Sequence, residues 1–290
     1  MHTKQRLILL SPALATIGFF LVLPLIIVLV YSFFTPGTYG GVEWIFSTGA
    51  YVQFLFERDL FDETILTFNS AYLQIYGRSF AQALVATLFC LVIGLPTAYF
   101  IATRPANQRT VWLLLVTVPY WVNLLIRTLA MLFLIRDEGP INAMLMGIGI
   151  TTEPVRIAYT NFAIALGLFY SYLPFMVLPI YAAIERFDFR LVDAAHDLYS
   201  SKWQTMRYVI IPAVKPGIIA GCLLVFIPSI GSFIAPDLLG GGKNLMIGNM
   251  IALQFQSSRN WPFGAAAAVI LMTIVLLALL ILARSRQDDR

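Results

Sequence analysis

Residues 7–30 read LILLSPALATIGFFLVLPLIIVLV, and no charged side chain interrupts this run, which continues uncharged to Val42. An α-helix needs about 20 apolar residues to cross a hydrocarbon core roughly 30 Å thick. The run therefore predicts one complete transmembrane helix. The pattern recurs in four more uncharged stretches, residues 79–103, 157–184, 216–236 and 260–283, and in a fifth, residues 110–135, that contains only Arg127.

The composition supports the same class of protein. Of 290 residues only 19 are basic and 15 acidic, so 12% are charged, whereas 59% are hydrophobic and the mean hydropathy is +0.82. Soluble domains are about 25% charged, which excludes a soluble enzyme, a disordered chain and a nucleic-acid-binding module. The two cysteines, Cys90 and Cys222, both lie in apolar runs, so a disulfide scaffold is excluded as well.

The sequence predicts an all-α, polytopic fold with six transmembrane helices. Their length and their Leu, Ile and Ala content favour helices over barrel strands, which would alternate over about ten residues. Residues 1–290 are expected to form a single membrane domain. The predicted spans are residues 10–34, 79–102, 111–135, 159–183, 215–237 and 263–283.

The basic residues predict the orientation of these spans. The two ends of the chain and the loops at residues 103–110 and 185–215 carry twelve Lys and Arg, against six in the other loops. Cytoplasmic loops are enriched in Lys and Arg, so both termini are expected to be cytoplasmic. The outer side is acidic and includes a cluster of Glu57, Asp59, Asp62 and Glu63, either a solvated surface or a feature that docks a partner or concentrates a cation.

Catalytic and metal-binding patterns are missing from the sequence. The two histidines, His2 and His196, have no companion at a metal-ligand spacing. Residues 240–244, GGGKN, resemble a phosphate-binding loop, but Asp237 and Asn244 stand where such a motif needs Gly and Ser or Thr. No acid falls near a bilayer midplane, where ion-coupled carriers usually have one. The chain is therefore not expected to be an enzyme, to hold a metal or to bind nucleotide itself.

The loop at residues 185–215 contains a short amphipathic helix. Leu191, Ala194, Ala195 and Leu198 follow a spacing of i, i+3, i+4 and i+7 and share one face. The small alanines would let the backbone of a partner approach closely. The alternative is a surface helix lying at the membrane interface.

The same loop resembles the EAA loop of ABC importer permeases, which contact the ATPase subunits through it. That family has Glu-Ala-Ala, three residues, Gly, nine residues and then Ile-x-Leu-Pro. The matching residues here are Asp193, Ala194, Ala195, Tyr199, Val209, Ile211 and Pro212. Tyr199 replaces the glycine, and a left-handed turn costs a non-glycine residue about 1–2 kcal/mol. The sequence therefore predicts that this loop turns differently from the family pattern.

Further strings resemble the spermidine/putrescine permeases, and in particular the first permease subunit. They are residues 119–128 (PYWVNLLIRT), 139–142 (GPIN), 236–245 (PDLLGGGKNL) and 260–264 (NWPFG). The resemblance implies a multi-pass protein of the bacterial inner membrane that moves polyamines. It also implies a second permease, two copies of a cytoplasmic ATPase that holds ATP and Mg, and a periplasmic binding protein, with membrane lipid around the spans, no nucleic acid, and no cofactor in this chain. Alternatives are another small amine, an opine or a phosphonate as substrate, or a stand-alone channel or ion-coupled carrier.

Aromatic and polar residues inside the spans are candidates for the translocation path. Aromatic faces suit the methylenes and ammonium groups of a polyamine. Tyr120 and Trp121 lie about 15 Å into the third span at 1.5 Å per residue, and Tyr170 and Tyr172 reach a similar depth in the fourth. Asn123 is a candidate because an amide at that depth needs a polar partner.

Two charged residues and a glycine pair complete the set of candidates. A charge near hydrocarbon is costly when it is alone, so Arg127 is expected to be structural and to order the outer gate, by snorkelling or by pairing with Asp237. Asp237 could then be shared with a passing ammonium, although both groups could instead simply meet headgroups and water. Gly217 and Gly221 have the spacing of close helix packing, either within the chain or between permeases.

Overall fold

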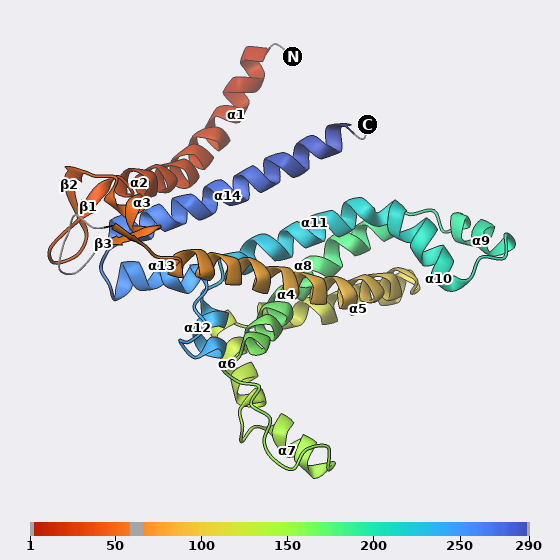
Figure 1. Ribbon diagram of the computed structural model, residues 1–290. Coiled ribbons are helices and arrows are strands. Elements are labelled where there is room, and N and C mark those ends of the chain that lie inside the picture. The colour runs from red at the N-terminus through yellow and green to blue at the C-terminus, as the bar shows by residue number, and fades with distance from the viewer. Residues whose placement is uncertain (1–2, 59–65, 289–290) are drawn as a thin grey trace. The chain divides into compact units, whose positions relative to one another are not determined.

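The computed structural model describes residues 3–58 and 66–288 (Figure 1). Asp59, Asp62 and Glu63 of the outer acidic cluster lie outside the described residues. The chain divides into two compact units: residues 1–74 together with 250–290 form the first, and residues 75–249 form the second. The single membrane domain over residues 1–290 stays a prediction.

The first unit pairs the N-terminal helix with the C-terminal one. Helix α14 (Trp261–Asp288) packs along α2 (Leu23–Tyr31), and two short antiparallel hairpins, β1–β2 and β3–β4, follow α2. The remaining elements are α1 (Thr3–Ile17), the π-helical turn η1 (Gly18–Val22), β1 (Phe34–Pro36), β2 (Val42–Phe46), α3 (Gly49–Gln53), β3 (Phe56–Arg58) and β4 (Leu66–Phe68).

The second unit is a helical bundle. Its elements are α4 (Ala71–Ala102, which begins in the first unit), α5 (Ala106–Trp121), α6 (Leu124–Ile135), α7 (Pro140–Gly147), α8 (Asn161–Glu185), α9 (Arg190–Asp197), α10 (Lys202–Thr205), the π-helical turn η2 (Met206–Ile210), α11 (Ile211–Ile230), α12 (Ile234–Gly240) and the start of α13 (Ile247–Gln256). In Figure 1, α9 and α10 lie at the same end of this unit as the connection from α4 to α5, and α7 projects at the other end.

Small residues let α4 and α11 approach α8 closely. A Cβ added at Gly221 would lie 2.9 Å from the sulfur of Met176, and one at Gly217 would lie 2.7 Å from the carbonyl oxygen of Pro179. Gly94 of α4 meets the side chain of Met176 in the same way. The glycine pair of α11 therefore serves packing within this chain, the first of the two alternatives that its spacing allowed.

The structure confirms the all-α membrane class and corrects two of the predicted spans. Five helices of the described residues are long and apolar enough to cross a membrane, and the number reaches six if one bent pair counts as a single span. That pair is the predicted span 111–135, which breaks after Trp121 and bends by 91°. The predicted span 215–237 is also wrong at its end, because its helix stops at Ile230 and α12 is a separate element.

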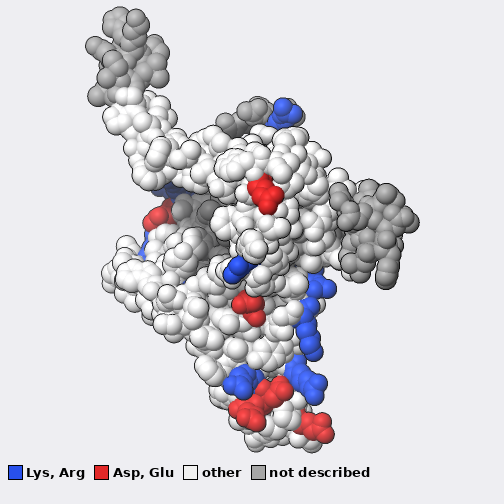
Figure 2. Space-filling model, turned by 90° about the vertical axis from the view of Figure 1, so that its left-hand side faces the viewer, with Lys and Arg blue, Asp and Glu red and all other residues white. Residues whose placement is uncertain are grey.

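Charged side chains of both signs lie at the end of the second unit that bears α7. Figure 2 shows both signs together at this lower end, with basic side chains continuing up one side of it. Arg136, Asp137, Glu138 and Arg156 belong to this region and line a shallow pocket of about 590 Å³.

Candidate functional site

The predicted helix of the 185–215 loop is α9, and it presents apolar side chains to its surroundings. Leu191 and Leu198 are 52% and 81% exposed, and Ala194 is exposed between them. Val192 is partly buried and packs against the core of the second unit. The helix is thus attached to the bundle while an apolar face stays uncovered by the described residues, as a docking helix requires.

The helix ends in a Schellman motif with Tyr199 in the left-handed position. The N–H of Ser200 donates to the carbonyl of Ala195 over 3.1 Å, and the N–H of Tyr199 donates to that of His196 over 2.9 Å. Tyr199 has φ = 59°, a conformation that glycine adopts far more easily. The prediction that the loop turns differently without glycine is therefore wrong. The two hydrogen bonds and the attachment of α9 hold the tyrosine in the turn.

A short and well-capped connection joins α9 to α11. Ser201 and Gln204 form a capping box, in which the side chain of Ser201 accepts from the N–H of Gln204 and that of Gln204 accepts from the N–H of Ser201. The hydroxyls of Ser200 and Thr205 are 2.7 Å apart. From Lys202 the helix runs without interruption to Ile230. A displacement of α9 would therefore be carried directly into α11.

Pro212 explains the π-helical turn inside this connection. Proline has no N–H, so Pro212 cannot donate to the carbonyl of Tyr208, and its ring crowds that carbonyl in an ordinary α-helix. The wider turn η2 at Met206–Ile210 comes just before it and accommodates the proline without ending the helix. Pro212 thus lies in the first turn of α11, where a missing N–H is tolerated.

The second group of candidates lies at the break of the third span. Val122 and Asn123 have extended backbones, with ψ of 140° and 134°, which ends α5 and starts α6. The side-chain oxygen of Asn123 accepts from the N–H of Leu125 over 2.9 Å and so caps α6. This contact supplies the polar partner that Asn123 was expected to need, and it makes Asn123 a determinant of the bend.

Arg127 reaches back across the break. It is only 6% exposed, and one guanidinium nitrogen, Nη1, donates to the carbonyl of Pro119 in α5 over 3.0 Å. The guanidinium carbon lies 5.6 Å from the ring centroid of Tyr120 and 5.8 Å from that of Tyr170. Arg127 thereby links α5, α6 and α8 through one hydrogen bond and two cation–π contacts.

Three of the predicted path residues gather around this arginine. Phe175 of α8 lies 5.0 Å from the ring of Tyr120 and 6.3 Å from that of Tyr172. The hydroxyl of Tyr172 donates to the carbonyl of Pro228 in α11 over 3.4 Å. Tyr120, Tyr170, Tyr172, Phe175 and Arg127 are called the tyrosine cluster below. Tyr120 and Tyr170 remain 46% and 38% exposed, so their rings are accessible from outside the bundle.

Trp121 and Asp237 lie outside the contacts of this cluster. Trp121 is 78% exposed, and Asp237 is exposed in the first turn of α12. Among the residues that the structure describes, Arg127 and Asp237 form no ion pair, and Nε of Arg127 is buried without a hydrogen-bond partner. The expected pairing of these two charges is thus not formed, and Arg127 uses a carbonyl and aromatic rings instead.

Sequence reasoning missed the bend and the two residues that build the cluster around it. Pro119 contributes a backbone carbonyl, which no side-chain pattern reveals. Phe175 belongs to a span with several aromatic residues, and the sequence does not distinguish the ring that joins the cluster. A signal for the bend was nevertheless present. Asn is a preferred N-cap residue, and Asn123 follows a proline by four residues within a predicted helix.

The bundle is apolar, and its exposed amphipathic helix α9 is joined through a short connection to α11, an arrangement compatible with a membrane subunit that partners drive. The family described as "Binding-protein-dependent transport system inner membrane component" matches residues 94–290, and the chain belongs to this family. It is therefore an inner-membrane transport protein and not an enzyme, as the sequence predicts, and it is a component of an assembly that includes a binding protein.

Known proteins are similar to this chain over most of its length. The spermidine/putrescine transport system permease protein PotB of Escherichia coli is 41% identical over 262 residues, which is 90% of each chain. PotB of Haemophilus influenzae is 46% identical over 214 residues, 74% of each chain. A solved bacterial ABC transporter that imports the acidic polysaccharide alginate has a chain with the same fold, with a TM-score of 0.68, 18% identity and coverage of 97% and 96% of the two chains.

Proposed function

We propose that this chain is a permease subunit of an ABC importer and forms half of the membrane path for polyamines such as spermidine and putrescine. The observation that carries the proposal is the 41% identity to a spermidine/putrescine permease over 90% of both chains. The tyrosine cluster supports it, because its exposed aromatic rings suit a flexible chain of methylenes and ammonium groups.

The proposed assembly places every nucleotide outside this chain. A second permease completes the path, two copies of a cytoplasmic ATPase bind ATP and Mg, and a periplasmic binding protein delivers the substrate. The chain itself needs no cofactor in this scheme. Within the described residues, no group of three or more His, Cys, Asp or Glu could hold a metal ion.

The coupling route runs from α9 to the tyrosine cluster. Closure of the ATPases would push on the exposed face of α9, formed by Leu191, Ala194, Ala195 and Leu198, and Asp193 would stay at its solvated side. The capped connection passes this motion to α11, whose glycines pack against α8 at Met176 and Pro179. Because packed interiors transmit displacement rather than absorb it, α8 would shift and carry Tyr170 and Tyr172 with it.

Arg127 has a structural role in this scheme. Its hydrogen bond to the carbonyl of Pro119 closes the bend between α5 and α6, and its charge rests between two tyrosine rings. An ammonium group would be repelled from that side of the rings and would contact their exposed faces or Asp237. Arg127 thus orders the outer gate, and the aromatic rings and Asp237 are left for the substrate.

Reconstituted transport tests the proposal. The chain would be purified with its second permease and ATPase, placed in proteoliposomes with the binding protein and ATP, and supplied with labelled spermidine, putrescine, a phosphonate and an opine. ATP-dependent uptake of the polyamines above the other compounds is expected. Uptake of a phosphonate or an opine instead would assign the same machinery to that substrate, and ATP-independent uptake would identify a stand-alone channel or an ion-coupled carrier.

A further inference from the structure

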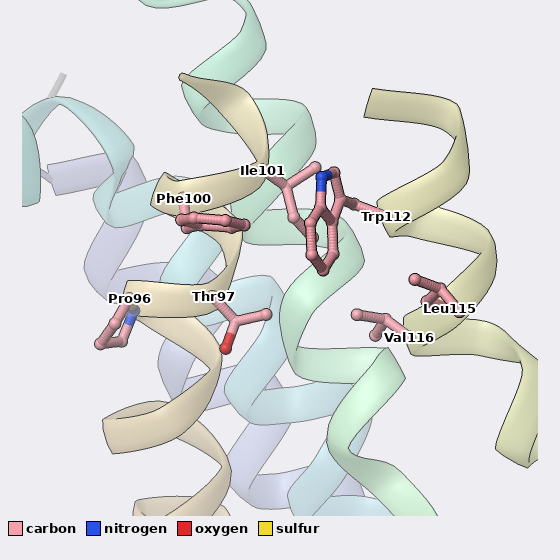
Figure 3. Close-up of a pocket in the computed structure, with 7 residues that line it drawn as sticks. All are labelled: Pro96, Thr97, Phe100, Ile101, Trp112, Leu115 and Val116. Carbon is pink, nitrogen blue, oxygen red and sulfur yellow. The ribbon is translucent and has the colours of Figure 1, made fainter. Parts of the chain in front are cut away.

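An apolar groove lies between α4 and α5, on the outside of the second unit. It has a volume of about 420 Å³ and is lined by Pro96, Thr97, Phe100 and Ile101 of α4 and by Trp112, Leu115 and Val116 of α5 (Figure 3). The hydroxyl of Thr97 already donates to the carbonyl of Ile93 over 2.7 Å. The groove therefore favours an apolar occupant over a polar one.

The side chains along the groove are open to their surroundings. Phe100 and Trp112 are 37% and 38% exposed, and Leu115 is 56% exposed. The rings of Phe100 and Trp112 meet edge to face with centroids 5.2 Å apart, so they form a firm wall at one end of the groove. The other end is bordered by Pro96 and Val116, deeper along the two helices.

The guanidinium of Arg104 lies at the aromatic end of this groove. The guanidinium carbon of Arg104 lies 4.0 Å from the ring centroid of Phe100, and Arg104 is exposed. Arg109 adds a second positive charge, and its Nε donates to the carbonyl of Arg104 over 2.7 Å. Arg109 also interacts with Tyr181 of α8, so Arg104 is the guanidinium that is free to meet a ligand.

The spacing of cation and groove matches one leaflet of a bilayer. Arg104 follows Pro96 by eight residues, which is roughly 12 Å along a helix, and one leaflet of hydrocarbon is about 15 Å deep. The connection at residues 103–110 is on the side where Lys and Arg are most numerous. A basic residue between spans on that side is a recognised setting for the headgroup of an anionic lipid.

We propose that the groove between α4 and α5 is a binding site for an anionic phospholipid of the cytoplasmic leaflet. An acyl chain lies along Thr97, Leu115 and Val116, and the phosphate meets Arg104 with Arg109 behind it. Phe100 and Trp112 lie between the acyl chain and the phosphate, at the depth of the membrane–water interface. The charge at the mouth argues for a lipid over a helix of the second permease, whose apolar side chains would leave Arg104 without a counter-ion.

Native mass spectrometry of the intact assembly tests the site. The complex is purified in detergent and supplied with equal amounts of dioleoyl phosphatidylglycerol, which is anionic, and dioleoyl phosphatidylcholine, which is zwitterionic. Wild-type complex is expected to retain phosphatidylglycerol preferentially. Arg104→Gln should lower this preference about five-fold, because one basic residue contributes about that factor near an anionic surface.

A matched control and a filling variant separate the two halves of the site. Arg136→Gln removes an exposed arginine that also lies over a phenylalanine ring, Phe133 at 6.0 Å, but away from the groove, and should change nothing. Thr97→Trp fills the groove and should lower retention of both lipids. Equal retention of the two lipids by the wild type, or equal effects of Arg104→Gln and Arg136→Gln, would overturn the proposal.

Photochemical cross-linking identifies the occupant directly. With benzoylphenylalanine in place of Leu115, illumination in native membranes is expected to add the mass of a phospholipid to this chain. A cross-link to the second permease alone would mean that a protein covers the groove, which also refutes the proposal. Loss of phosphatidylglycerol on addition of 10 mM inorganic phosphate would reveal a site for free anions and not for lipid.

Discussion

Replacing Tyr199 by glycine should stabilise the end of α9. Tyr199 has φ = 59° and is 97% exposed, so its side chain contributes little burial while its backbone carries the cost of the left-handed turn. That cost is about 1–2 kcal/mol. Glycine removes it but gains freedom in the unfolded loop, which offsets roughly 0.5–1 kcal/mol. The expected net stabilisation is about 0.5–1 kcal/mol.

Hydrogen exchange of the loop measures this local free energy. The amide of Ser200, which donates to the carbonyl of Ala195, is the reporter because its bond exists only when the turn is closed. A gain of about 0.5–1 kcal/mol corresponds to roughly two-fold to five-fold slower exchange. Tyr199→Ala is the matched control: it removes the ring but keeps a Cβ in the left-handed conformation, so it should leave the exchange rate near that of the wild type.

The two variants also separate backbone strain from a role of the ring in docking. If the exposed ring of Tyr199 contacts the ATPase, both variants should weaken co-purification of that subunit by a similar factor. Unchanged or faster exchange in Tyr199→Gly, or equal slowing in Tyr199→Gly and Tyr199→Ala, would refute the reasoning from the left-handed backbone.

Four other substitutions test the coupling route and the tyrosine cluster. Ala195→Arg should abolish co-purification of the ATPase while the spans stay folded, and normal assembly with normal substrate-stimulated hydrolysis would remove α9 from coupling. Gly221→Leu should cost about 1–3 kcal/mol of overpacking and lower the melting temperature of the complex, whereas Gly231→Ala, where an added Cβ meets no described atom within 4 Å, should not. Arg127→Gln should cost about 1–3 kcal/mol because the carbonyl of Pro119 loses its donor, seen as lower yield and thermal stability with the ratio of spermidine to putrescine uptake unchanged. Asp237→Asn should raise the KM for polyamine uptake up to about five-fold, the scale of an exposed ion pair, and leave basal ATP hydrolysis intact; an unchanged KM would exclude this carboxylate.

The membrane class and most of the spans could be predicted from the sequence because each depends on the apolar character of 20 or so consecutive residues. The bend in the third span could not, because it depends on two extended residues, Val122 and Asn123, within an apolar run. Hydropathy averaged over a long window does not resolve such a break. A single N-cap residue is too weak a signal to change the prediction of one continuous helix.

The sequence placed three members of the tyrosine cluster at a similar depth but did not predict their contacts, nor the parts that Pro119 and Phe175 take in them. Tyr120, Tyr170 and Tyr172 were expected at similar depth, and the structure brings them together, yet the partner of Arg127 is a backbone carbonyl instead of Asp237. Tyr199 shows the converse case. Its residue type argues against a left-handed turn, but the two hydrogen bonds of the Schellman motif decide the backbone there.

We expect helix α8 to be the element through which the two candidate regions communicate. One part of it, at Met176 and Pro179, receives the glycines of α11, which continues directly from the segment beside α9. The preceding turns carry Tyr170, Tyr172 and Phe175 into the cluster around Arg127. Because α11 approaches α8 at glycines, the backbones of Met176 and Pro179 lie close to it, and a shift of one helix has little slack before it moves the other. A driving motion at α9 is therefore expected to change the spacing of the tyrosine rings before it changes the bend itself, which the hydrogen bond from Arg127 to Pro119 holds closed.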